Sequence, residues 1–483
     1  MIKLSAAQME NIGFRYALDA LELFSPYGEQ QRRQLRMFGP KDAQELEIQL
    51  RNVNGLMTRL ATYKEKIDRL DRLLMQLKDI RRTVERCRDV ALSEIELFEL
   101  KRFTLQLELI APSANELMEL ADTKGIRITK VEGALNVLDT DSARGATFFI
   151  NDSHSDKLLA ARKAKREIER QLRAQQDVKQ REKLNGIRVE LAAQEDEEET
   201  RIRAELCVQL RPYVDELLAN MDMIGALDFT IARARLAQRY GGVLPEIGAD
   251  ELRFDDMINP RIADALLQDG RAFTPVSIAA GAGATVITGA NMGGKSIALK
   301  TLALGVLLVH AGMLPFASRA QLPLFDGMFI VSEDLENIER GLSSFGAEIV
   351  RFNEVMAARE QRSLILLDEF ARGTNPDEGA QIVRGTTRYL DGLSDISVLT
   401  THYDGVAQYA SRHYQVAGLR DMDMRKVRTR IGEGADGISA IAECMNYGLY
   451  EVHDNADCPR DALNICRLLS FPDEILEYIE SLY

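Results

Sequence analysis

The stretch TGANMGGKS, residues 288–296, combines three glycines with a lysine and a serine at the spacing G-x-x-x-x-G-K-[ST]. Glycine lets the backbone fold closely around phosphate with its N–H groups pointing inward. A β-branched run precedes the loop and an apolar helical pattern follows it, which is the context that a phosphate-binding loop requires. We predict that Lys295 reaches the β- and γ-phosphates of ATP and that Ser296 ligates Mg²⁺. The predicted ATP-binding residues of the loop are Gly289, Asn291, Gly293, Gly294, Lys295 and Ser296.

A carboxylate pair follows the loop in SLILLDEF, residues 363–370. Four apolar residues predict a buried strand, and Asp368 and Glu369 come at its carboxyl end, where ligands bind in parallel sheets. Asp368 is expected to hold Mg²⁺, and Glu369 is expected to orient or polarise the attacking water. A strand that ends in Asp-Glu is weak evidence alone, but it is strong evidence after a phosphate-binding loop.

A third strand, in SVLTTHYDG at residues 397–405, ends in His402. A lone histidine is more often structural than catalytic, but here it follows a strand behind both motifs, so we predict a sensor of the γ-phosphate. The predicted catalytic residues are therefore Lys295, Glu369 and His402. RGLSSFGAEI, residues 340–349, reads as a loop entering a helix, with Ser343 or Ser344 as the cap and Glu348 in the second turn.

Two kinds of pattern divide the chain. The first 225 residues or so are poor in Gly and Pro, and their apolar residues recur at three- and four-residue spacing, which predicts long amphipathic helices. From about residue 227, short β-branched runs alternate with helical patterns, which predicts an α/β layer with a largely parallel sheet.

The most polar helical stretch is residues 156–206. Eleven Lys/Arg stand against four acidic residues between 157 and 188, a net charge of +7, before EDEEE at 195–199 reverses the sign. Asn185-Gly186 between the two blocks predicts the turn of an antiparallel helical hairpin. Its charged faces are either simply solvated or, as the sharper alternative, its basic arm contacts phosphate or a partner.

Composition limits the classes of protein that the chain can be. Its 483 residues suggest two to four domains, and no apolar run is long enough to span a bilayer. No signal-peptide core is present, and five scattered cysteines include no CxxC, so a cytoplasmic protein with reduced thiols is expected. The net charge of −14 counts mildly against DNA as the main partner.

The motifs together resemble the MutS family of mismatch-repair ATPases. The resemblance runs in order through TGANMGGKS, RGLSSFGAEI, LLDEFARGTNPDEG and TTHYDGV, and upstream to AFTPVSI, which is similar to the segment that approaches adenine. It implies an α/β ABC-type P-loop ATPase domain at 226–458, preceded by a mainly α-helical lever domain, similar to the MutS core, at 1–225. It further implies a C-terminal helical dimerisation segment at 459–483.

The resemblance also implies roles for residues. Phe273 would lie at the adenine, Ser343 would be the signature serine that reaches the other subunit's nucleotide, and residues 371–374 would lie at the dimer junction. A homodimer with two composite sites that use ATP and Mg²⁺ is therefore expected. The mismatch-reading and connector domains and most of the clamp domain are not evident, which makes this a short form.

Two functions stay open for such an ATP-hydrolysing dimeric switch. One is ATP-dependent binding of mismatched or branched DNA in DNA repair, through the hairpin at 156–206. The alternative is an ATPase subunit that remodels or reactivates a protein client, such as a cobalamin-dependent aminomutase, without DNA. A metabolic kinase is disfavoured, because elements like those of Ser343 and His402 belong to dimerising ABC-type sites.

Overall fold

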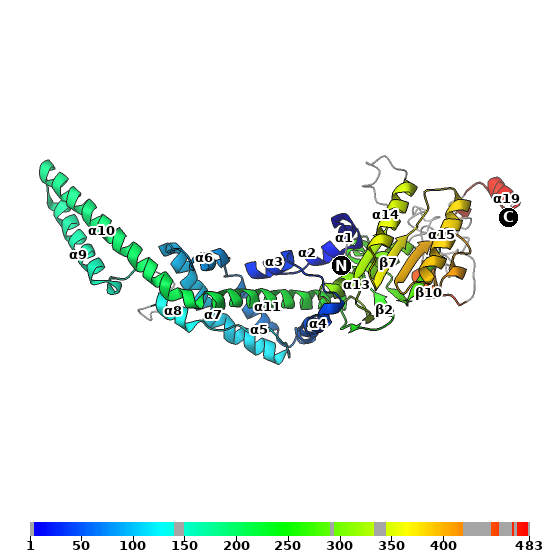
Figure 1. The fold of residues 1–483 in the computed structure, drawn as a ribbon, viewed down its shortest axis with the longest axis horizontal. Helices are drawn as coiled ribbons and strands as arrows, with labels where there is room; N and C mark the ends of the chain where they lie inside the picture. The colour runs from blue at the N-terminus through cyan, green and yellow to red at the C-terminus, as the bar shows by residue number, and fades with distance from the viewer. Residues whose placement is uncertain are drawn as a thin grey trace. The chain divides into compact units, whose positions relative to one another are not determined.

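The computed structural model forms two compact units, shown as a ribbon in Figure 1. It describes residues 4–139, 149–289, 294–332, 344–418, 446–453, 466–467 and 471–481. The sheet unit comprises Met1–Leu21, Leu35–Thr58 and Ala232–Tyr483, and the helical unit comprises Glu22–Gln34 and Arg59–Ile231. These units do not follow the predicted division at residue 225, because two early segments of the chain pack with the sheet.

A six-stranded sheet forms the centre of the sheet unit, with the strand order β10-β9-β4-β8-β7-β6. Its five strands from β9 to β6 are parallel, and β10 pairs antiparallel with β9. Strands β4, β6, β7 and β8 are buried along almost their whole length, as expected of parallel strands covered on both faces. The strands are β4 (Gly283–Thr288), β6 (Gly327–Val331), β7 (Ser363–Asp368), β8 (Ile396–Thr401), β9 (Arg412–Gly418) and β10 (Asn446–Glu451). The prediction of a largely parallel α/β layer is confirmed.

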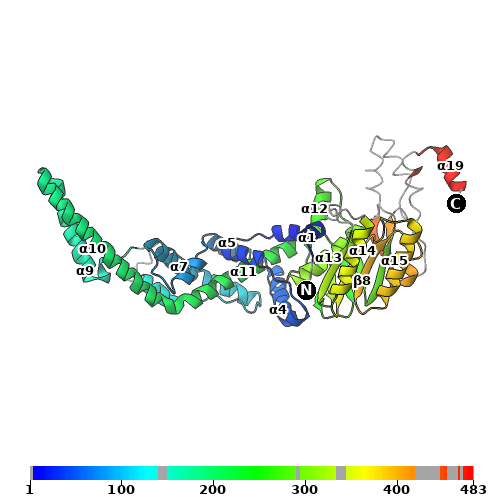
Figure 2. The ribbon, with the colours of Figure 1, turned by 45° about the horizontal axis from the view of Figure 1, so that its top comes forward.

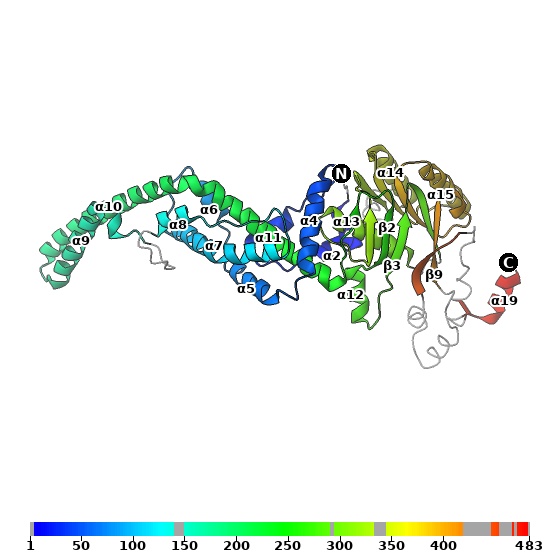
Figure 3. The ribbon, with the colours of Figure 1, turned by 90° about the horizontal axis from the view of Figure 1, so that it is seen from below.

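Helices and a second sheet cover the two faces. Helix α13 (Lys295–His310) is buried along nearly its whole length, because it contacts β2 and β3 of the second sheet as well as β7 and β8 of the first. Figures 2 and 3 show α14 (Ser344–Ala358) and α15 (Pro376–Asp391) on one side of the six-stranded sheet and β2 and β3 on the other. The second sheet, in the order β1-β5-β2-β3, contains β1 (Glu246–Ile247), β2 (Leu252–Met257), β3 (Val276–Ala280) and β5 (Arg319–Leu322).

Early helices of the chain are held on this unit by specific polar contacts. Gln8 Nε2 donates to the carbonyl of Ile330 on β6 at 3.1 Å, and Phe38 N donates to the carbonyl of His310 at 2.7 Å. The remaining helices of the sheet unit are α1 (Ala6–Ile12), α2 (Phe14–Asp19), η1 (Pro40–Asp42), α4 (Ala43–Met57), α12 (Pro260–Gln268), η5 (Ala407–Tyr409) and α19 (Asp473–Ser481). Of the predicted dimerisation segment at 459–483, only residues 466–467 and 471–481 are described.

The helical unit contains α3 (Pro26–Arg33), α5 (Lys64–Leu74), α6 (Arg81–Arg86), α7 (Glu94–Leu120), α8 (Glu132–Leu138), η2 (Asp152–His154), α9 (Asp156–Ala174), α10 (Val178–Leu210), η3 (Arg211–Tyr213) and α11 (Val214–Tyr240) up to Ile231. Buried Asp228 of α11 fixes the start of α3, because its carboxylate accepts from Phe24 N, Ser25 N and Ser25 Oγ. Ser25 in turn caps α3 by accepting from Gly28 N. In the described part of the chain, no helix combines the length and apolarity that crossing a bilayer requires.

Helices α9 and α10 form an antiparallel hairpin, but its turn is not where the sequence pattern placed it. The prediction of a turn at Asn185-Gly186 is wrong, because α10 runs unbroken through both residues. The chain reverses at residues 175–177 instead, where Asp177 accepts from Lys179 N and caps α10. A single glycine weakens a helix by only about 1 kcal/mol relative to alanine, so the capped 33-residue helix tolerates it.

Candidate nucleotide site

The predicted phosphate-binding loop lies between β4 and α13. Gly289 follows β4 directly, at φ +140°, and a Cβ there would lie 3.1 Å from Val416 Cβ. Gly294 precedes α13 at φ +84°, a backbone conformation that favours glycine. A Cβ at Gly294 would lie 3.0 Å from the ring of Tyr447 on β10, so this aromatic ring lies against the loop. The predicted ligands Asn291 and Gly293 lie outside the described residues.

Lys295 begins α13, directly after Gly294. Its side chain is 2 % exposed, its Nζ donates to the carbonyl of Gly289 at 2.9 Å, and the same nitrogen lies 3.3 Å from Glu369 Oε1. The ammonium group is thus buried between the start of the phosphate-binding loop and the carboxylate pair. Such a cation is well placed to meet a phosphate that enters the loop.

Ser296 and Asp368 meet although they are 72 positions apart. Ser296 Oγ donates to Asp368 Oδ1 at 2.8 Å, and Thr400 Oγ1 donates to the same oxygen at 2.8 Å. Only β8 separates β4 from β7, so the first turn of α13 faces the end of β7. A hydroxyl and a carboxylate at hydrogen-bond distance are hard oxygen donors of the kind that Mg²⁺ prefers, so the pair fits the predicted metal.

Glu369 follows β7 in a left-handed backbone conformation, with φ +49°. Its backbone N–H donates to Thr400 Oγ1 at 2.9 Å, and its carboxylate is 2.8 Å from Arg372 Nη1 as well as 3.3 Å from Lys295. Sequence reasoning had placed Arg372 only within the expected dimer junction at 371–374 and had not singled out Thr400. Arg372 follows Glu369 by three residues within ARGT, a spacing that could have suggested it, whereas nothing distinguishes Thr400 from other residues of a buried strand.

His402 lies beside this carboxylate pair and is half-buried. Burial lowers the pKa of its imidazole, the charges of Lys295 and Arg372 act in the same direction, and Glu369 opposes them. The ring is therefore neutral at neutral pH. Its Nδ1 is buried without a hydrogen-bond partner among the described residues. A buried polar atom of this kind marks a position where a ligand or water can bind.

The other predicted residues are not brought to this cluster by any described contact. Phe273 is partly exposed, in the segment between α12 and β3. Tyr447, which sequence reasoning missed, is the aromatic residue seen against Gly294, and burial raises the pKa of its phenol while Arg271 opposes that effect. Ser343 lies outside the described residues, and α14 begins at the next position.

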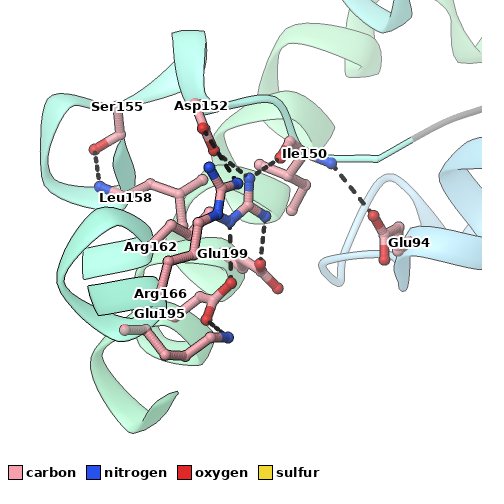
Figure 4. Close-up of polar contacts among 10 residues, drawn as sticks. Glu94, Ile150, Asp152, Ser155, Leu158, Arg162, Arg166, Glu195 and Glu199 are labelled. Atoms are coloured by element: carbon pink, nitrogen blue, oxygen red, sulfur yellow. Dashed lines mark hydrogen bonds and ion pairs between the residues drawn. The ribbon is translucent and has the colours of Figure 1, made fainter. Parts of the chain in front are cut away.

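The hairpin of α9 and α10 carries the basic run that was predicted as one possible contact with phosphate. Figure 4 shows that Arg162 bonds Asp152 at 2.7 Å, Glu195 at 3.0 Å and Glu199 at 2.7 Å, with a fourth bond to the carbonyl of Ile150. Lys165 also pairs with Glu195. The base of the hairpin is therefore neutralised internally. The exposed cations nearer the tip are Arg170, Arg173, Lys179, Arg181, Lys183 and Arg188.

Comparison with known proteins identifies the C-terminal part of the chain. Residues 285–476 match the family model of MutS domain V. Proteins named Endonuclease MutS2 are similar: the one from Agathobacter rectalis is 33% identical over 230 residues, which is 47% of this chain and 28% of that protein. The one from Enterococcus faecalis is 35% identical over 243 residues, 50% of this chain and 30% of that protein. The Thermomicrobium roseum protein is 34% identical over 241 residues, 47% of this chain and 30% of that protein.

Each of these matches thus spans less than a third of the relative's own length. The matched domain contains Ser296, Asp368, Glu369 and His402, which the structure brings together at one edge of the parallel sheet. The C-terminal part of the chain is therefore similar to domain V of the MutS family.

Proposed function

We propose that the chain binds ATP with Mg²⁺ and hydrolyses it to ADP and phosphate. The observation that carries the proposal is the meeting of Ser296 Oγ with Asp368 Oδ1 at 2.8 Å, beside the ion pair of Lys295 and Glu369. A lysine and a serine hydroxyl after a glycine loop, together with two carboxylates at a strand end, form the donor set that phosphoryl transfer requires.

Each residue has a distinct role in this proposal. Ser296 and Asp368 would hold Mg²⁺, which when bound neutralises negative charge on the β- and γ-phosphate oxygens. Lys295 stabilises the same charge with its buried ammonium group. Glu369 orients the attacking water and accepts its proton. Neutral His402 contributes a hydrogen bond through its buried Nδ1, either to the γ-phosphate or to that water.

Lys295 and Arg372 are the ion-pair partners that hold the carboxylate of Glu369. Both cations lie within 3.3 Å of Glu369, so its negative charge is shared between them. A γ-phosphate within reach of Lys295 would compete with Glu369 for the ammonium group. Binding of ATP would then change the contacts of Glu369, which gives the site a simple way to link binding with hydrolysis.

The test of ATP hydrolysis is phosphate release by the purified chain with Mg²⁺ and ATP. We expect a steady rate that requires Mg²⁺ and that disappears in Lys295→Ala, whose binding of ATP is also lost. ATP binding without any phosphate release by the unmodified chain would limit the proposal to a nucleotide-binding switch.

We further propose that the site works in a homodimer, with Ser343 of one copy completing the nucleotide site of the other. Complementation separates this arrangement from a site within one chain. Lys295→Ala and Ser343→Ala would each be inactive alone, but mixing the two would restore hydrolysis, because one of the two composite sites would have all its residues. Activity that stays lost on mixing would argue for a site within a single chain.

For the biological role, we propose ATP-dependent binding of DNA in DNA repair, with mismatched or branched DNA as the expected substrates. The similarity of residues 285–476 to MutS domain V supports this choice, and the comparisons do not support the aminomutase alternative. The exposed cations near the hairpin tip are the candidate phosphate contacts. ATPase rates measured with duplex, mismatched and branched DNA over a salt series test the role. A rate that no DNA form changes would return the protein-client alternative to first place.

A further inference from the structure

The turn that carries Glu369 is held in a strained conformation. Glu369 has φ +49° and Ala371 has φ +61°, and neither residue is glycine. Left-handed backbone at a non-glycine residue is unfavourable and persists only when surrounding contacts impose it. The contacts that impose it therefore determine where the carboxylate of Glu369 lies.

Two side chains from other elements bond both backbone polar groups of Ala371. Glu348 Oε2, on α14, accepts from Ala371 N at 2.8 Å. The Tyr403 hydroxyl, from the residue after His402, donates to the carbonyl of Ala371 at 3.1 Å. Glu348 is 5 % exposed and Tyr403 is 9 % exposed, so both bonds are shielded from water.

Close packing leaves the turn little freedom to move. A Cβ on Gly379 of α15 would lie 2.4 Å from the Tyr403 hydroxyl and 2.9 Å from the carbonyl of Ala371, so only glycine leaves room there. Ala371 and Tyr403 also belong to the buried apolar cluster of this sheet, together with Phe370 and Val383. A close-packed interior transmits a displacement rather than absorbing it.

We infer that Glu348 and Tyr403 are positioning residues, which act on ATP hydrolysis by fixing the Glu369 turn. The inference rests on the proposed ATPase function. It also gives α14 a part in catalysis: the helix begins at Ser344, directly after the predicted signature serine Ser343, and its Glu348 bonds the hydrolytic turn. A shift of α14 would therefore displace Glu369, because the buried hydrogen bond between Glu348 and Ala371 N joins the helix to the turn.

The inference predicts that binding and catalysis respond differently. Lys295 and Ser296 are on α13, and their bonds to Gly289 and Asp368 do not involve Glu348 or Ala371. Removing that bond lets the turn relax toward ordinary backbone angles and displaces the Glu369 carboxylate. Misplacement of a catalytic group by about 1 Å can slow a reaction by about 100-fold, whereas affinity for the nucleotide should change little.

The test compares Glu348→Ala, Glu348→Gln and Tyr403→Phe in the full chain. Glu354→Ala is the matched control, because Glu354 lies on α14 with an exposed side chain paired to Arg351. We expect kcat to fall roughly 10- to 100-fold in Glu348→Ala, with the dissociation constant of a fluorescent ATP analogue within about twofold of the unmodified chain. Glu348→Gln should recover most of the rate, because its amide oxygen accepts the same hydrogen bond. Tyr403→Phe should lower kcat without weakening binding.

Three outcomes would overturn the inference: an unchanged kcat in Glu348→Ala, a parallel loss of binding and rate, or a Glu348→Gln variant as slow as Glu348→Ala. Glu369→Gln separates this inference from the ATPase proposal. If Glu369→Gln is inactive while Glu348→Ala is fully active, only the positioning role fails. If Glu369→Gln hydrolyses ATP normally, the assignment of Glu369 fails first. Single-turnover rates should also show no further loss when Glu348→Ala is added to Glu369→Gln.

Discussion

Lys295 Nζ lies 3.3 Å from Glu369 Oε1, with the lysine side chain 2 % exposed and the glutamate side chain 14 % exposed. The two residues are 74 positions apart, and the order of the parallel strands brings them together. The pair joins the predicted phosphate-binding group directly to the predicted hydrolytic group. This contact makes binding and hydrolysis separable by mutation, because each residue has a different proposed task.

Lys295→Ala should abolish ATP binding. The variant removes the buried cation that meets the phosphates and also leaves Glu369 with Arg372 as its remaining ion-pair partner among the contacts described above. Titration with a fluorescent ATP analogue measures the effect. Lys300→Ala is the control on the same helix, because Lys300 Nζ bonds the exposed side chain of Asn11. Equal affinity in Lys295→Ala and the unmodified chain would exclude the loop assignment.

Hydrolysis should stay insensitive to pH where an ordinary histidine titrates. Burial lowers the pKa of His402, so its neutral form persists as pH falls through about 6.5, and protonation becomes important only below that value. The kcat of the unmodified chain should therefore be flat across that range. His402→Ala should lower kcat, and its pH profile should likewise show no inflection near pH 6.5. An inflection in the unmodified chain that His402→Ala removes would show that the imidazole titrates normally.

Asp228 should make the helical unit less stable as pH rises from about 4 to about 6. Burial raises the pKa of Asp228 to about 6, against the hydrogen bonds from Ser25 and Phe24, and nearby Asp71 adds to the rise. Between the ordinary pKa and about 6, the folded state binds more protons than the unfolded state, so its free energy of unfolding falls with pH by about 2–3 kcal/mol. Urea unfolding at several pH values measures this fall in the free energy of unfolding.

Asp228→Asn should lack this component of the pH dependence, because an amide does not titrate. The control is Asp222→Asn on the exposed side of the same helix, where Asp222 pairs with Arg81. The control should keep the pH dependence of the unmodified chain. Identical pH profiles for Asp228→Asn and the unmodified chain would contradict the prediction.

The hairpin tip should account for the salt dependence of DNA binding. Replacing Arg173, Lys179 and Arg181 with glutamate removes three exposed cations. Each phosphate contact contributes about −0.9 to the slope of log affinity against log salt, so three lost contacts should flatten that slope by about 2–3. The control set is Lys64, Arg82 and Arg127, which are exposed elsewhere on the helical unit. Equal effects of both sets would assign DNA binding to general charge rather than to the tip.

Most residues of the candidate nucleotide site were predicted from short sequence motifs. The loop, Asp368, Glu369 and His402 could be predicted because each follows a recognisable strand pattern, and parallel strands bring their carboxyl ends to one edge. Thr400 and Tyr447 were missed because a hydroxyl or an aromatic ring in a strand carries no local signal of its partner. Their roles depend on which strands are neighbours, and that is decided by the tertiary fold.

Local sequence patterns were also insufficient to predict how the elements of the fold pack together. Helical periodicity identified the early helices but could not say that Met1–Leu21 and Leu35–Thr58 pack with the sheet. Contacts such as Gln8 with Ile330 join residues more than 300 positions apart, which no local pattern encodes. The prediction of a turn at Asn185-Gly186 was wrong because it relied too much on a local signal. A strong local turn signal was outweighed by the helix around it and by the cap at Asp177.

Phosphate release by the Glu369→Gln variant, measured beside its binding of ATP, tests the central claim most directly. The account predicts that the variant binds ATP about as tightly as the unmodified chain and hydrolyses it roughly 100- to 10,000-fold more slowly, because an amide cannot accept the proton of the attacking water. A variant that binds ATP and releases phosphate at the unmodified rate would contradict the account, because the carboxylate paired with Lys295 would then have no part in hydrolysis.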